Sequence, residues 1–403
     1  MSFNEKLEKL FSVPGDGTDS WRRKSWDRFL DLGLPRMKAE AFQYVPLSKL
    51  YERELAFAPL RAAGAEFDLL PECSGSYILF IDGHFHPDLS KIPEGLVALT
   101  LPSAMKSYGL VLQNRIARTL KEETDPFAAL NGAFQGTGAF LYVPPKIAIE
   151  SSLQIVHIST SKHLASPRIQ LFVGKGASLK IVQTLSGDFT NAVFDVVLDE
   201  AAQFKFYDAS LLSHDAWAMQ AFRATLKQNS TLETFHLTNG SETVRTSLKI
   251  QLTEDNAEAH LRGISLLDGA AEAHVHGLIE HQAPSCRSRQ HFKSVLRGES
   301  RSSFEGKIYV RPIAQKTEAY QAANSLILSD TAVSNAKPNL EIFADDVKAS
   351  HGATVAQPNE EELFYLRSRG LSYEGARDLL VRGFCQELLD LFPFPLIRQK
   401  VLL

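Results

Sequence analysis

The sequence predicts a mostly-β chain built as a solenoid of short stacked strands, with helical regions at both ends. A short unit recurs along the middle of the chain, and no long helical crossover interrupts that stretch for about 200 residues. Helical periodicity is confined to the first and last segments. These three observations favour stacked strands over an alternating α/β fold.

Residues 2 to about 60 form the N-terminal helical segment in this prediction. Trp21 and Trp26 recur at helical spacing with charged residues between them, and Gly33 and Pro35 end the helix. A buried strand is expected near 76–82, where a run of apolar residues leads into Asp-Gly.

The recurring unit combines small residues with a strand in which apolar and polar residues alternate. Its copies are separated by about 25 to 28 residues, except for the last step, which is about half as long. The copies are Gly176-Ala-Ser-Leu-Lys-Ile-Val, Ala201-Ala-Gln-Phe-Lys-Phe-Tyr, Ser230-Thr-Leu-Glu-Thr-Phe-His, Asn256-Ala-Glu-Ala-His-Leu-Arg and Ala270-Ala-Glu-Ala-His-Val-His.

The last two copies, Ala257-Glu-Ala-His-Leu-Arg-Gly263 and Ala271-Glu-Ala-His-Val-His-Gly277, are near duplicates. A unit too short to bury its own apolar face must stack on its neighbours, as in a β-solenoid. Half-period copies then come from two sheets that face each other across a flattened coil. The alternative is a β-sandwich, which also has short, regularly spaced strands.

The chain after Pro358 predicts a helical hairpin. Asn359-Glu-Glu-Glu362 fits an N-cap followed by a glutamate three residues on. The segment from Arg369 to Ser372 is a turn, and Pro393 ends the second helix. The apolar stripe of that helix suits docking on a partner or on the β core; it comprises Ala376, Leu379, Leu380, Phe384, Leu388 and Leu391.

Three regions follow from these patterns. Residues 1–110 are mainly helical with the short strand near 76–82, 125–357 form the β core, and 358–403 form the C-terminal helical region.

Composition indicates a globular protein that binds neither nucleic acid nor membrane. Apolar residues make up 44% and charged residues 22%, and the formal net charge is −4. No dense basic run, signal-peptide pattern or membrane-length apolar window is present. Three widely separated cysteines indicate a reducing compartment, and we expect the cytoplasm.

Common catalytic motifs do not occur. Gly174-Lys175 and Gly306-Lys307 lack the spacing of a phosphate-binding loop and are typical of turns. There is no GxSxG elbow and no HExxH. We therefore expect no enzymatic active site within this chain.

The histidines raise the question of a metal site. His274 and His276 lie two apart, so on a strand both face the same side, and His260, His281 and His291 are near in sequence. The simpler expectation is that they lie on the solvent-facing side of the solenoid.

Cys286 is expected to be a small buried apolar residue, with a ligand role as the less favoured interpretation. Cys73 and Cys385 are expected to pack in the same way. Three thiols cannot supply a four-cysteine iron–sulfur site, so we expect no cofactor held by this chain alone.

The stretch before Gly352 is unusually polar. Asp345 and Asp346 are adjacent and would face opposite ways on a strand, so they do not form an acid/base pair. From its residue type and setting alone, His351 is better explained by a polar last strand than by a functional role.

A series of motifs resembles the SufB/SufD family of iron–sulfur cluster assembly proteins, over most of the chain. The most specific are Gly306-Lys-Ile-Tyr-Val310, Ala314-Gln-Lys-Thr317, Lys337-Pro-Asn-Leu-Glu-Ile342, Ala344-Asp-Asp-Val-Lys348, Ser350-His-Gly-Ala-Thr354 and Leu363-Phe-Tyr-Leu-Arg-Ser-Arg-Gly370. Weaker agreement includes Glu280-His-Gln-Ala-Pro-Ser-Cys286, Asp125-Pro-Phe-Ala-Ala-Leu-Asn131 and Phe42-Gln-Tyr44. The form Ser350-His-Gly-Ala-Thr354 is similar to the SufD branch.

The resemblance implies a right-handed parallel β-helix with helical ends, acting as a non-catalytic scaffold with SufB and the SufC ATPase. It implies that the last strands pair with SufB and that a transient iron–sulfur cluster forms near this junction, with His351 contributing. It also implies that the helical tail holds SufC; the expected contact residues are Leu363, Phe364, Arg367, Arg369, Leu380 and Phe384.

One departure from the family pattern concerns residue 349. Many SufD sequences have cysteine just before Ser-His-Gly, where this chain has Ala349, so no thiolate is available there. The exposed terminal edge also leaves homodimerisation of the isolated chain open.

Two other functions are compatible with a chain of this kind. A β-helix enzyme acting on carbohydrate would need carboxylates or a metal in a groove along one sheet. A histidine-based metal-binding protein would use His274 and His276.

Overall fold

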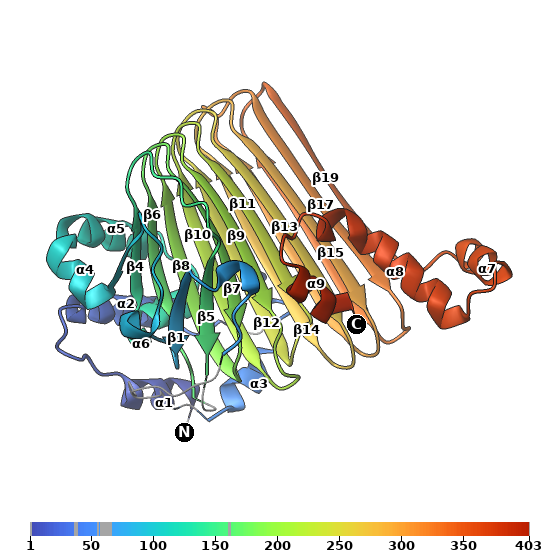
Figure 1. Ribbon diagram of the computed structural model, residues 1–403, viewed down its shortest axis with the longest axis horizontal. Helices are drawn as coiled ribbons and strands as arrows, with labels where there is room; N and C mark the ends of the chain where they lie inside the picture. Colours follow the sequence, from blue (N-terminus) through green and yellow to red (C-terminus); the bar gives the residue numbers. More distant parts are fainter. Residues whose placement is uncertain (1, 36–38, 55, 57–66, 160–162, 403) are drawn as a thin grey trace.

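A computed structural model describes residues 2–35, 39–54, 56, 67–159 and 163–402. Its centre is a parallel β-solenoid of two facing sheets, with helices at both ends (Figure 1). From β4 onward the strands alternate between the sheets along the chain, so each pairs in parallel with the strand one full turn away, while β2 and β3 pair antiparallel at the N-terminal end. This arrangement confirms the predicted fold class and excludes the sandwich alternative, in which the pairing would be antiparallel.

Among the described residues, sheet one has ten strands. In spatial order they are β19 (Val347–Ala356), β17 (Thr317–Ile327), β15 (Arg287–Leu296), β13 (Glu258–Leu267), β11 (Thr231–Thr238), β9 (Gln203–Ser210), β7 (Ser178–Leu185), β5 (Leu153–Ile158), β1 (Tyr77–Ile81) and β2 (His84–Phe85). The strand predicted near 76–82 is therefore β1.

Sheet two has nine strands in the part of the chain that the structure describes. In spatial order they are β18 (Val333–Ile342), β16 (Arg301–Val310), β14 (Glu272–His281), β12 (Thr243–Leu252), β10 (Trp217–Leu226), β8 (Phe189–Leu198), β6 (Arg168–Val173), β4 (Ala139–Val143) and β3 (Val97–Thr100). The two near-duplicate units begin β13 and β14, one in each sheet, which confirms the half-period interpretation.

A stack of left-handed turn residues precedes the strands of sheet one and sets the register between turns. Each has positive φ and donates its backbone N–H to a carbonyl of the next turn, from Ala201 to Gln228 and finally from Lys316 to Asp346. Such backbone favours glycine and asparagine, which explains the small and polar residues in the recurring unit. The stacked residues are Lys146, Gly176, Ala201, Asn229, Asn256, Ser285 and Lys316.

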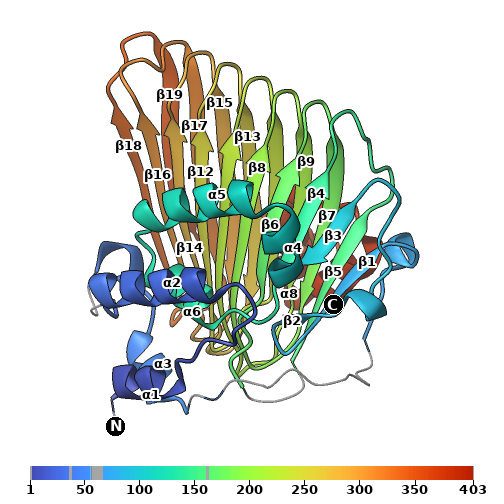
Figure 2. The same ribbon diagram turned by 90° about the vertical axis from the view of Figure 1, so that its left-hand side faces the viewer.

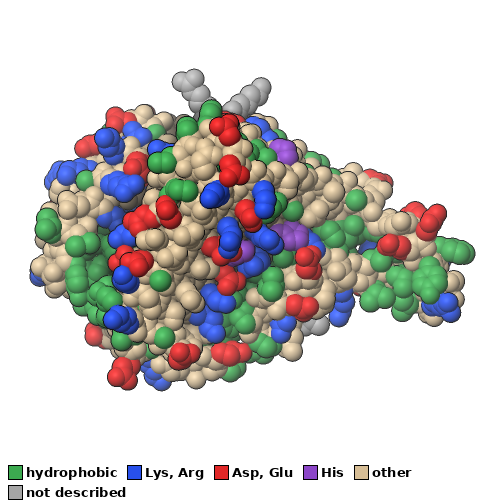
Figure 3. All heavy atoms as spheres, turned by 90° about the horizontal axis from the view of Figure 1, so that it is seen from above, with side chains coloured by type: hydrophobic (Ala, Val, Ile, Leu, Met, Phe, Trp, Pro, Cys, Tyr) green, Lys and Arg blue, Asp and Glu red, His purple; other side chains and the backbone are tan. Residues whose placement is uncertain are grey.

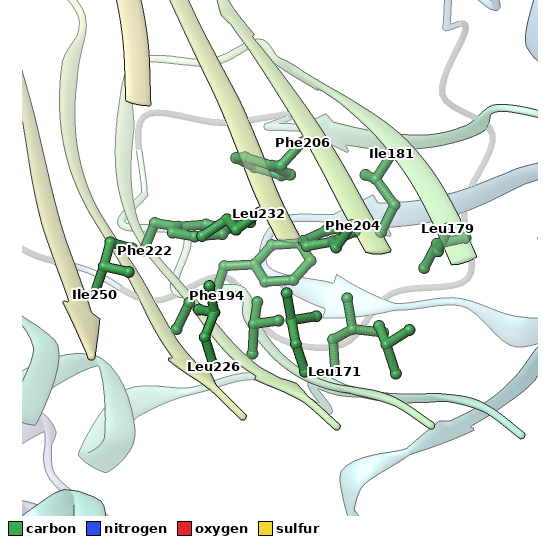
Figure 4. Close-up of a cluster of buried hydrophobic side chains, with 14 of the residues drawn as sticks. Leu171, Leu179, Ile181, Phe194, Phe204, Phe206, Phe222, Leu226, Leu232 and Ile250 are labelled. Atoms are coloured by element: carbon green, nitrogen blue, oxygen red, sulfur yellow. The ribbon is translucent and has the colours of Figure 1, made fainter. Parts of the chain in front are cut away.

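The lumen between the sheets holds the main apolar core (Figure 4). Phe206 stacks on Phe222 with ring centroids 4.8 Å apart, and Phe194 meets Phe206 edge-on at 5.0 Å. Aliphatic residues from both sheets fill the layers around them. Because inward and outward residues alternate along each strand, one face of every strand is fixed in this core.

Helices from the N-terminal half cover the outer face of sheet two (Figure 2). Arg168 and Asp195 form an ion pair at 2.8 Å beneath this cover. The helices are α1 (Phe3–Leu10), α2 (Asp19–Leu32), α3 (Leu47–Glu52), α4 (Leu101–Ser107), α5 (Gly109–Lys121) and α6 (Pro126–Phe134), with short 3-10 turns at Glu40–Phe42, Pro71–Cys73 and Pro87–Leu89.

The C-terminal helices are α7 (Glu360–Ser368), α8 (Tyr373–Leu389) and α9 (Pro395–Leu402). Asn359 caps α7 and accepts backbone N–H bonds from Glu361 and Glu362, as the sequence predicts. The end of α8 and the segment after it pack on the outer face of sheet one, where Phe392 meets Tyr207 and Phe235 edge-on. No described helix is both long and apolar enough to cross a membrane.

Candidate functional site at the open end of the solenoid

The two sheets end in β18 and β19, and within the described part of the chain neither has a strand on its outer side. No residue of β18 or β19 is fully buried, whereas every strand from β4 to β17 has buried positions. An unpaired parallel edge presents a row of free backbone donors and acceptors. This open end is therefore a template for further strand pairing.

His351 lies on β19, on the side that faces the lumen. Its register partner is Gln321 of β17, which is buried, and Ala349, two residues earlier, packs against an inward-facing apolar cluster. The imidazole is exposed because no further turn covers it. Because Ala349 faces inward, a cysteine at this position would also have faced the lumen at the open end.

Asp345 and Asp346 lie in the bend before β19, not on a strand as the sequence argument assumed. The Asp346 carbonyl accepts from Lys316 at 2.6 Å, and its N–H donates to the Gln315 side chain at 2.9 Å. Both bonds use the backbone of Asp346. They continue the turn stack of sheet one to its last member.

Cys286 is fully buried in a turn, with its sulfur 3.3 Å from the carbonyl oxygen of Glu254. Burial raises the pKa of the Cys286 thiol to about 11. Burial likewise raises the pKa of Cys73 to about 12 and that of Cys385 to about 11. Thiols held protonated in this way are weak nucleophiles and weak metal ligands, which agrees with the packing role expected for all three.

The prediction that the clustered histidines face solvent is wrong for His274. Its ring is buried against Ser303 at 2.9 Å and Glu272 at 3.1 Å. The outer face of sheet two is covered at this level by the N-terminal segment, where Arg245 lies 4.0 Å over the ring of Phe42. Sequence proximity could not show this cover, which comes from the far end of the chain.

His276 and His281 are also enclosed. Burial lowers the pKa of each to about 4. His281 is fully buried and bonds Ser288 at 2.8 Å, while His260 and His291 belong to the opposite sheet. The described residues contain no group of three metal-ligating side chains, so the geometry gives no support to the histidine metal site.

A shallow hollow of about 210 Å³ lies on the outer face of sheet one. Its carboxylates, Glu258 and Glu318, come from strands separated by β15, which places Arg287 in register between them. Glycoside hydrolysis needs two carboxylates that flank one bond. Glu258 and Glu318 do not form such a pair, because Arg287 lies between them.

The expected docking residues of the tail fall into three groups. Leu363 is buried between α7 and the rest of the tail, and Leu380 and Phe384 are half-buried. Lys293 lies 5.1 Å over the Phe384 ring and donates to the Phe384 carbonyl at 2.8 Å, so Phe384 helps to hold α8 on sheet one. Phe364, Arg367 and Arg369 are exposed.

Helix α7 projects away from the body of the molecule, and apolar side chains gather on this projection (Figure 3). Tyr365, Leu371, Tyr373 and Leu379 join Phe364 as exposed large apolar residues. Clustered exposed apolar surface of this kind is typical of protein interfaces.

Sequence reasoning missed two buried residues beneath His351. Gln290 and Gln321 occupy the same lumen-facing position in successive turns, opposite Gly277 and Gly306. The signal was present, because a glutamine and an opposing glycine recur together, but it needed the strand register to be seen.

Comparison with known proteins matches two family models. The SUF system FeS cluster assembly SufBD core domain covers residues 156–384, and the SufBD protein N-terminal region covers 2–155. An iron–sulfur cluster assembly SufBD family protein of Synechocystis is 28% identical, covering 94% of this chain and 88% of that protein. The iron–sulfur cluster assembly protein SufD of Escherichia coli is 24% identical, covering 99% and 95%. SufB of Bacillus subtilis is 23% identical, covering 95% and 87%.

Proposed function

The chain belongs to the SufBD family of iron–sulfur cluster assembly proteins, and we propose that it is a non-catalytic scaffold subunit that pairs with a SufB-like chain and docks a SufC-like ATPase. The open end of the solenoid is the observation that carries this proposal. A strand edge with no buried residue and no outer neighbour in the described chain fits continuation by a related solenoid.

In this proposal a transient iron–sulfur cluster, as cargo, forms at the junction. His351 is the group that the chain offers to it, because it faces the lumen at the last turn. Imidazole nitrogen is a good ligand for iron. The three buried thiols leave the cysteine chemistry to the partner.

The ATPase would dock on the surface of α7. Phe364 and Tyr365 supply its apolar centre, and Arg369 lies 5.1 Å over the Tyr365 ring beside them. Aromatic and arginine residues dominate the energetic centres of protein interfaces. Because three separate cysteines remain free, we place the work of the complex in a reducing compartment, the cytoplasm.

The test is co-expression of the tagged chain with SufB-like and SufC-like chains, with purification through the tag alone. We expect both chains to co-purify with it. Recovery of the tagged chain alone, with both partners present and folded, would contradict the proposal.

A second variant locates the ATPase. Deleting residues 359–403 would also strip the apolar cover from sheet one, including Phe392, so loss of binding by that deletion could come from unfolding. Phe364→Ser with Tyr365→Ser changes only exposed side chains. We expect it to release the ATPase and keep the SufB-like chain. Leu396→Ser, on the exposed side of α9, is the matched control.

A further inference from the structure

A column of side chains runs along the lumen and ends at His351. Gln290 of β15 is in register with Gln321 of β17, which is in register with His351 of β19. In-register parallel strands lie about 4.8 Å apart and place these side chains on the same side. Gln290 and Gln321 are 2% and 3% exposed, while their neighbours along the strands are more exposed.

Both carboxamides are unpartnered. The amide oxygen and nitrogen of Gln290 and of Gln321 are buried with no hydrogen-bond partner among the described residues. Two glutamine side chains deeper in the lumen do have hydrogen-bond partners. Gln183 donates to Asp208 at 3.0 Å, and Gln220 donates to Ser210 at 2.7 Å. A buried polar group without a partner is destabilising, because it has lost its hydrogen bonds to water. Gln321, with both ends of its carboxamide unpartnered, lies in the turn directly below His351.

The opposite sheet makes room for these two carboxamides. A Cβ on Gly306 would collide with the Gln321 amide nitrogen, and one on Gly277 would lie 3.0 Å from the Gln290 amide oxygen. Neither glycine has positive φ, so space is the reason for glycine at both positions, not backbone conformation. Two successive turns repeat the same pairing of glutamine with glycine.

We propose that the Gln321 carboxamide, which has no partner in the structure, turns to pair with a ring nitrogen of His351, so that Gln321 is a positioning residue, with Gln290 as the next carboxamide of the column. A neutral imidazole has one donor and one acceptor nitrogen, and a carboxamide can pair with either. The bond fixes one tautomer and aims the other nitrogen at the junction. Histidines that bind metals are usually held through their second nitrogen in this way. This role for His351 rests on the proposed function.

The test is nitrogen NMR of the full chain labelled with ¹⁵N-histidine, at about pH 8.5, where an ordinary histidine is neutral. His351→Ala identifies the His351 signals. In the unaltered chain the two ring nitrogens of His351 should be widely separated in shift, as in a single tautomer. Gln321→Met keeps the length and removes the bond, so it should draw the two shifts toward their average.

Two further variants control the result. Gln321→Glu keeps an acceptor and should restore the separation, and it serves as the second variant if methionine disturbs folding. Asn324→Ala removes an amide that bonds β17 to Thr354 of β19 at 2.8 Å, but on the outward face, so it should leave the His351 signals unchanged.

Unchanged His351 shifts in folded Gln321→Met would overturn the proposal, as would equal changes in Asn324→Ala. Because the free chain is used, this failure is distinct from failure of partner co-purification. If co-purification fails but Gln321→Met still changes the His351 shifts, Gln321 positions His351 as proposed. In that case only the proposed function of His351 is contradicted.

Discussion

Replacing Phe364 with alanine should weaken ATPase docking without unfolding the chain. A phenylalanine buries about 150–250 Å² when enclosed. Phe364 is 73% exposed, which leaves about 150 Å² for a partner to cover. At about 25 cal/mol per Å², that area corresponds to about 3–4 kcal/mol, or at least about a hundredfold in Kd. The free energy of unfolding should change by less than about 0.5 kcal/mol, because the side chain is already in solvent.

Titration calorimetry with the SufC-like ATPase and urea denaturation of the free chain measure the two effects separately. Leu396→Ala, an exposed apolar residue on α9, is the control and should change neither quantity. A Kd within about threefold of the unaltered chain would refute docking through α7. Loss of more than about 1 kcal/mol of stability would refute the argument that Phe364 is free for a partner.

Three other predictions concern the folded chain itself. Phe392→Ala should lower the free energy of unfolding, measured by urea denaturation, by about 3–5 kcal/mol, because a fully buried ring between the tail and sheet one is lost. A loss below about 1 kcal/mol would show that the tail is not anchored there. Burial raises the pKa of the thiols of Cys73, Cys286 and Cys385 to about 11–12. At neutral pH these thiols should therefore resist iodoacetamide until the chain is unfolded. Fast alkylation of the native chain would contradict this prediction. Burial lowers the pKa of His281 to about 4, below its unfolded value, so the unfolded state binds more protons and the free energy of unfolding should fall as pH drops from about 6.5 toward 4. His281→Gln should flatten this part of the stability curve. An unchanged slope would argue against a buried neutral ring.

The sequence predicted the solenoid because its signal is repeated. Alternation along each strand, the small turn residues and the half-period duplicates all follow from stacking two sheets, and the structure repeats the same turn conformation from Gly176 to Lys316. The helix cap at Asn359 was equally local. Such features depend on residues close together in the chain, so they can be predicted from pattern alone.

Features set by distant contacts were predicted less well. His274 was expected in solvent but is covered by a segment more than half the chain away. Phe42 of that segment contacts Arg245, which is in register with His274. Of the apolar stripe predicted for the second tail helix, Ala376 and Leu388 are buried, but Leu379 and Leu391 are exposed. Val381 and Cys385, which lie outside that stripe, are buried with the first two. Helical spacing shows that a stripe exists, while the partner surface decides which side of it is buried.

The candidate site was also predicted only in part, because some of its features are local and others depend on strand register. His351 was found through its motif, but its lumen-facing side follows only from the register of β17 and β19. Gln321 carries no motif of its own and became visible only as an unpartnered carboxamide beneath that histidine.

The central claim is that another solenoid continues this one across its open end. Ala353 lies on the lumen-facing side of β19 above buried Ala323, yet it is exposed in the free chain. Ala353→Asp should therefore leave the fold intact but bury an unpaired carboxylate on assembly, costing about 3 kcal/mol or more. Ser350→Asp places the same charge on the outward face and serves as the control.

The decisive measurement is the affinity of these two variants for the SufB-like chain, by titration calorimetry on purified proteins. The account predicts at least about a hundredfold weaker binding for Ala353→Asp and a much smaller change for Ser350→Asp. Equal affinity of Ala353→Asp and the unaltered chain would show that the lumen does not continue across the junction.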